Sequence, residues 1–105
     1  MTVNIKRLPS LDRMGRRSIP YRINLGKETF DRMLVNVPET QRAYYEDKAE
    51  VLGAPAVDVV LPEEVAVSIS FDCPKKAVKD MYEISINNKL FATADILQNV
   101  VKALA

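Results

Sequence analysis

Four arginines near the beginning of the chain have the residue type and spacing to bind phosphate. Arg13, Arg16 and Arg17 lie within five residues, and Arg22 follows them. A guanidinium group offers a planar fork of donors that can bind two phosphate oxygens at once. Residues 1–32 contain eight Lys or Arg and three Asp or Glu, a net charge of +5, so the other residues carry −4. The cluster predicts either a polyanion-binding segment or a solvated basic loop that pairs with the acidic remainder. The second interpretation is favoured.

Adjacent tyrosines at positions 44 and 45 are candidates for a protein interface. On a helix, neighbouring side chains point about 100° apart, so both rings cannot be buried against one surface. Exposed tyrosine is enriched at protein interfaces. Tyr44 and Tyr45 therefore predict that one ring is available to a partner.

Most familiar catalytic chemistry is excluded by residues that the sequence lacks. It has no histidine, only one cysteine (Cys73), and three isolated glycines that form no phosphate-binding or dinucleotide motif. A cation site built from Glu63 and Glu64 with Asp58 or Asp72 would be conceivable, but such a turn is usually just solvated. We therefore expect no enzyme activity, no cofactor and no metal.

The sequence predicts six short strands, which span residues 2–8, 19–25, 57–61, 65–71, 82–86 and 89–92. Four of them show alternation of apolar and polar residues, residues 57–61 are a nearly continuous run of Val and Leu, and residues 89–92 are the return strand after the turn at Asn87-Asn88. The short connection Pro62-Glu63-Glu64 predicts that the third and fourth strands are antiparallel neighbours. Asn87-Asn88 suits a tight turn that joins the fifth and sixth strands as a hairpin.

Helical spacing of apolar residues predicts two or three helices. Residues 27–35 form a short candidate, and residues 38–52 begin at Pro38 and stop before Gly53. From Thr93, which can cap a first turn, the apolar residues follow an amphipathic helical stripe. These residues are Ile96, Leu97, Val100, Val101 and Leu104.

The length and the pattern of elements predict one small α+β domain. The chain has 105 residues, of which 48% are hydrophobic, and its net charge is +1. We expect a mainly antiparallel sheet of about five or six strands with the C-terminal helix packed on it. Residues 9–18 are expected to form an exposed basic loop or arm.

The most economical functional hypothesis is a non-catalytic module for protein interaction or assembly. A small sheet with one covered face leaves another face and its edges exposed, which favours a homo-oligomer or another protein partner. A small accessory or viral-type protein would look much the same. The alternative is a nucleic-acid-associated protein whose basic loop contacts phosphates. No apolar run is long enough for a transmembrane helix, and a single cysteine suits a reducing compartment, so a cytoplasmic protein is expected.

Overall fold

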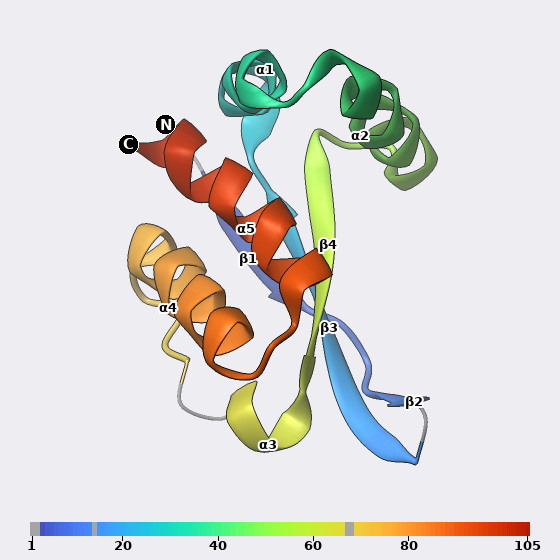
Figure 1. Ribbon diagram of the computed structural model, residues 1–105, viewed down its shortest axis with the longest axis vertical. Helices are drawn as coiled ribbons and strands as arrows, with labels where there is room; N and C mark the ends of the chain where they lie inside the picture. Colours follow the sequence, from blue (N-terminus) through green and yellow to red (C-terminus); the bar gives the residue numbers. More distant parts are fainter. Residues whose placement is uncertain (1–2, 14, 67–68) are drawn as a thin grey trace.

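In the part of the chain that the structure describes, the fold consists of a four-stranded antiparallel sheet and five helices. Figure 1 shows their arrangement. The computed structural model describes residues 3–13, 15–66 and 69–105, without the side chain of Arg13. The strands are β1 (Asn4–Arg7), β2 (Leu11–Arg13), β3 (Arg16–Asn24) and β4 (Ala56–Pro62). The helices are α1 (Gly26–Asn36), α2 (Glu39–Leu52), α3 (Glu63–Ala66), α4 (Pro74–Asn87) and α5 (Phe91–Leu104). The predicted α+β class is therefore confirmed.

Strand β3 is the centre of the sheet. On one side it pairs with β1 along Tyr21–Asn24 and with β2 along Arg16–Ser18. On its other side it pairs with β4, from Ser18 opposite Pro62 to Asn24 opposite Ala56. Each of these pairings is antiparallel. The two helices α1 and α2 form the connection between β3 and β4, which brings distant parts of the sequence side by side.

Alternation along β3 and β4 creates the apolar face that the core is built on. Successive strand residues point to opposite faces of a sheet. The core-facing residues of the two strands are at most 5% exposed; they are Ile19, Tyr21, Ile23, Val57, Val59 and Leu61. On the opposite face Arg22 and Asp58 lie opposite each other and remain partly exposed. The strands predicted at residues 19–25 and 57–61 are thus confirmed.

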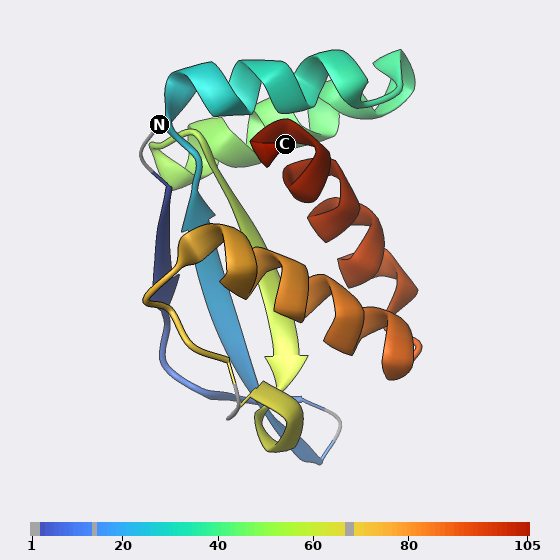
Figure 2. The same ribbon diagram turned by 90° about the vertical axis from the view of Figure 1, so that its left-hand side faces the viewer.

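Helices α4 and α5 cover the apolar face, while α1 and α2 lie at one end of the sheet (Figure 2). Helix α5 contacts α4, α1 and β4. Its stripe includes Leu97 and Val100, both 0% exposed, so the predicted docking of the C-terminal helix is confirmed. It begins at Phe91, two residues before the predicted cap at Thr93.

The strand predicted at residues 65–71 is wrong, and so is its pairing with β4. Glu63–Ala66 form the short helix α3, and Ile69–Phe71 have no regular structure; residues 67 and 68 lie outside the described part. Ile69 is still buried, and the Phe71 ring lies 5.5 Å from the Tyr21 ring between centroids. These side chains therefore cover the sheet without pairing as a strand.

The predicted hairpin of residues 82–86 and 89–92 is also wrong, because two helices occupy this region. Pro74 begins α4; proline is favoured there because a backbone N–H at the first helical position would have no partner within the helix. The buried residues of α4 recur with a helical period and are Ala77, Val78, Met81 and Ser85. The chain does reverse near Asn88, whose backbone N–H and side-chain amide both donate to the Ile84 carbonyl, at 3.0 and 2.8 Å. The reversal therefore joins two helices, and among the described residues the sheet has four strands instead of the predicted five or six.

The predicted exposed arm at residues 9–18 is largely a β-hairpin. Strand β2 pairs with the beginning of β3 across a turn that contains Gly15, whose φ is 76°. Asp12, Arg16 and Arg17 are exposed, whereas Ser18 is buried. In Figure 1 this hairpin forms the lower end of the sheet.

Helix α2 matches its predicted range and termination. Pro38 lies at the N-cap, one residue before the predicted position, and Gly53 follows the last helical residue with φ 71° and ψ 18°. This left-handed conformation costs glycine little, and the Gly53 N–H donates to the Glu50 carbonyl at 3.1 Å. Arg42 of α2 donates to the Val37 carbonyl at 3.0 Å and to the Val35 carbonyl at 3.3 Å. These bonds link α2 to the C-terminal end of α1.

Candidate interaction site

The two candidate tyrosines lie on α2 in different environments. Tyr45 is 6% exposed, and its hydroxyl accepts a hydrogen bond of 3.3 Å from the Asn99 amide of α5. Tyr44 is 54% exposed, and its ring meets that of Tyr45 edge-on with centroids 5.5 Å apart. The structure therefore assigns Tyr45 to the core and leaves Tyr44 accessible.

An exposed face of α2 continues from Tyr44 along the helix. Asp47, Lys48 and Val51 follow at i+3, i+4 and i+7, spacings that share one side of a helix. All four residues are exposed, and Val51 reaches 83%. We call Tyr44, Asp47, Lys48 and Val51 the α2 stripe.

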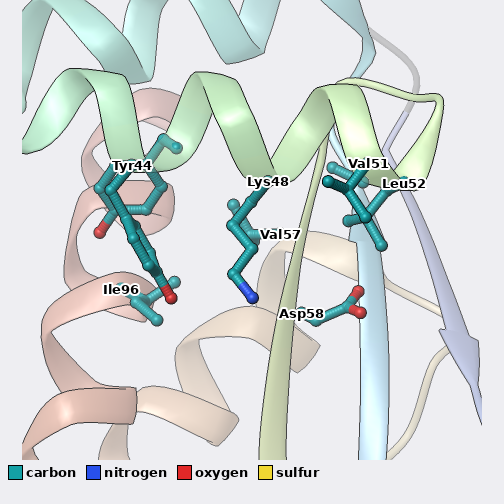
Figure 3. A pocket seen from close by; sticks show the side chains of 9 residues that line it. Tyr44, Lys48, Val51, Leu52, Val57, Asp58 and Ile96 are labelled. Carbon is teal, nitrogen blue, oxygen red and sulfur yellow. The ribbon is translucent and has the colours of Figure 1, made fainter.

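A small hollow borders the α2 stripe between α2, β4 and α5 (Figure 3). It has a volume of about 140 Å³. Its lining is mostly apolar or aromatic and consists of Tyr44, Tyr45, Lys48, Val51, Leu52, Ala56, Val57, Asp58 and Ile96. The volume suits one side chain and is well below the 300–1,000 Å³ that is usual for ligand pockets.

Two charged groups line this hollow, and they differ in how they are paired. Both carboxylate oxygens of Asp58 accept hydrogen bonds from Arg22, at 3.0 and 3.1 Å. The Lys48 ammonium lies 5.9 Å from the centroid of the Tyr44 ring, a weak cation–π contact at an exposed site. Lys48 can therefore accept an acidic partner without breaking an ion pair described in the structure.

Comparisons with protein-family models, with curated proteins and with solved structures found no match.

The structure describes the side chains of three of the four candidate arginines, and these three are not gathered at one place. Arg17 pairs with Glu63 at 3.4 Å, and Arg22 is engaged by Asp58. Arg16 and Arg17 point to opposite faces because they are neighbours on a strand. Arg16 and Arg22 share a face but are six residues apart, roughly 20 Å along the strand. Arg13 lies opposite Arg16 in the strand register, and its side chain is outside the described part.

Arg22 lies instead near two basic residues that the arginine cluster did not include. Lys6 and Arg7 of β1 line a shallow hollow together with Arg22 and the neighbouring Asn4 and Asn24. Strand pairing brings this group together, since Lys6 lies opposite Arg22 and Asn4 opposite Asn24. The flanking positions were visible in the sequence, but their convergence needed the strand register.

The described part of the chain contains neither a metal-binding group of side chains nor a membrane-spanning helix. Within the described ranges, no three carboxylate or thiol side chains lie close enough together to hold a metal ion. Among the helices described here, none is both long and apolar enough to cross a membrane.

The sequence drew attention to Tyr44 and Tyr45 as a pair, but not to the rest of the α2 stripe. A signal was present, because Val51 lies seven residues after Tyr44, and the oppositely charged Asp47 and Lys48 lie midway between them. In the structure the inner face is marked by Tyr45 and the half-buried Leu52, and Val51 lies outside it.

Burial of Tyr45 predicts a loss of stability in alkali. Burial raises the pKa of this phenol above its ordinary value of 10.0, and the hydrogen bond from Asn99 opposes the shift. The unfolded chain therefore ionises first, so stability is complete below about pH 10 and falls as the pH rises further. Urea unfolding at about pH 8 and about pH 11 should show this loss, with a smaller loss in Tyr45→Phe. Equal losses in both proteins would contradict this role of Tyr45.

Proposed function

We propose that the protein is a non-catalytic interaction module that assembles with itself through the surface around α2. The observation that carries this proposal is the sparse burial of α2. Of its fourteen residues only Tyr45 is buried, while Tyr44 and Val51 are 54% and 83% exposed. Helices in proteins are stabilised mainly by tertiary packing of an apolar face, so a second cover on this side would complete the packing of α2.

The composition of the surface supports a protein partner over a small substrate. Tyrosine is enriched in interfaces, and apolar anchors that fill small hollows contribute much of their binding energy. The α2 stripe combines such an aromatic with a hollow of about 140 Å³ beside it. A self-association surface also needs no constellation of catalytic groups, which agrees with a sequence that lacks histidine.

Binding of a nucleic acid by the β2–β3 hairpin stays a prediction of the sequence. Arg16 and Arg17 point to opposite faces of the sheet, and Arg22 lies farther along β3. Arg17 and Arg22 also pair with carboxylates. These observations do not add support for nucleic-acid binding.

Light scattering over a range of concentrations tests the proposed assembly. We expect the mass to rise above the monomer value of 11.8 kDa as the concentration increases. A contact made by one helix is smaller than a standard interface, so the association should be weak and should depend on concentration. Val51→Asp should keep the protein monomeric, because a charge would replace the most exposed apolar residue of the α2 stripe.

Val35 provides the matched control for this variant. It is also an exposed valine on a helix, 73% accessible on α1, but it lies outside the α2 stripe. Val35→Asp should associate as the unchanged protein does. A mass of 11.8 kDa at every concentration for the unchanged protein would overturn the proposed function.

A further inference from the structure

We propose that two copies of the chain pair through antiparallel α2 helices, with Tyr44 of each copy opposite Val51 of the other. The same register places Asp47 of each copy opposite Lys48 of the other. This proposal rests on the proposed function and names its partner, its surface and its register.

The spacing along α2 makes the stripe complementary to itself. Tyr44 and Val51 are seven residues, about 10 Å, apart along the helix axis. Asp47 and Lys48 occupy the midpoint between them. A two-fold axis through this midpoint exchanges the two apolar residues and also exchanges the two charged residues. One register thus satisfies both pairs, as an isologous interface requires.

Charge decides the direction in which the helices pair. In a parallel arrangement Asp47 would lie beside Asp47 of the second copy and Lys48 beside Lys48, which is repulsive. The antiparallel arrangement brings opposite charges to the same height along the two helices. Both residues are exposed, and no ion pair in the described part of the chain engages either of them.

The ends of the α2 stripe can accept the second copy. The hollow beside Tyr44 and Lys48 provides space for an incoming apolar side chain, and the exposed Val51 of the second copy is brought to that height. Pairing would then cover Tyr44, which is 54% exposed in the single chain. The contact is confined to one helix per copy, so a weak and reversible dimer is expected.

Exchange of the two central charges tests the register. In Asp47→Lys, the new lysine of each copy would lie opposite Lys48 of the other copy. In Lys48→Glu, the new glutamate of each copy would lie opposite Asp47 of the other copy. Each single variant should raise the dimer Kd at least about tenfold, because like charges would meet across the interface. The double variant Asp47→Lys with Lys48→Glu restores opposite charges and should return the Kd to within roughly threefold of the unchanged protein. Sedimentation equilibrium measures all four values, and far-UV circular dichroism checks that each variant is folded.

Glu46→Lys is the matched control, because Glu46 is an exposed acidic neighbour that points about 100° away from Asp47 on α2. Its Kd should stay within about twofold of the unchanged protein, since it lies outside the pairing surface. If the unchanged protein dimerises but the single charge variants do not weaken it, the α2 pairing is overturned while self-assembly stands. If the single variants weaken it and the folded double variant does not recover, the antiparallel register is overturned. If the unchanged protein never associates, both the pairing and the proposed function fail.

Discussion

Replacing Leu97 with alanine is expected to lower the free energy of unfolding by about 2 to 5 kcal/mol. Leu97 is 0% exposed and lies on α5, the helix that contacts α4, α1 and β4. Truncation removes buried apolar contacts and leaves a cavity where several elements meet. A domain of this size has only about 5 to 15 kcal/mol of stability in total. The melting temperature should therefore fall by roughly 10 °C or more, measured by circular dichroism.

Phe91→Ala is the control for this prediction. Phe91 is on the same helix and larger than leucine, but it is 61% exposed. Its truncation should change the free energy of unfolding by less than about 0.5 kcal/mol. An equal loss of stability in both variants would contradict the packing described for α5.

Glu83→Pro should have the second large effect, because Glu83 is an exposed residue inside α4. Proline removes a backbone hydrogen bond and clashes with the preceding turn, at a cost of about 3 kcal/mol or more. Loss of the helical signal in far-UV circular dichroism and a lower urea midpoint would report this damage. The strand interpretation of residues 82–86 would instead allow proline at a solvent-facing edge position.

Glu83→Ala separates the backbone effect from the loss of the side chain. Alanine is an excellent helix former, so its effect on the free energy of unfolding should stay within about 0.5 kcal/mol. If the proline variant were as stable as the alanine variant, α4 would not be a helix at this position.

Strands β3 and β4 show where sequence patterning was sufficient. In β3, Ile19, Tyr21 and Ile23 alternate with Pro20 and Arg22, and Gly26 ends the pattern within two residues of the end of the strand. Strand β4 was predicted from a nearly continuous run of Val and Leu after Gly53, interrupted by Asp58. Such patterns are local, because successive side chains of a strand point to opposite faces, and apolar residues at every second position are enough to give the strand an apolar face. The signals for helix α2 were equally local, because Pro38 marks its beginning and Gly53 its end.

Residues 82–86 show where two local patterns compete. Tyr82, Ile84 and Ile86 alternate as in a strand, while Ala77, Val78 and Met81 recur as in a helix that continues to Ser85. The structure uses the helical set, and it leaves Ile86 43% exposed. Ser85 is buried yet satisfied, because its hydroxyl donates to the Met81 carbonyl at 2.8 Å. Because Ser85 is polar, the core-facing side of α4 does not show a continuous apolar helical pattern in the sequence.

The sequence by itself determined the α+β class, the strands β1, β3 and β4, the helices α1, α2 and α5, and the exposure of one of the two tyrosines. Each of these depends on residues within one element. Tertiary structure alone decided that β4 pairs with β3 across two helices, that Arg17 and Arg22 pair with Glu63 and Asp58, and that Val51 stays uncovered. The physical reason is that strand partners, ion pairs and burial depend on contacts between segments far apart in the chain. Local periodicity says which side of a segment is apolar, but it does not say what that side will meet.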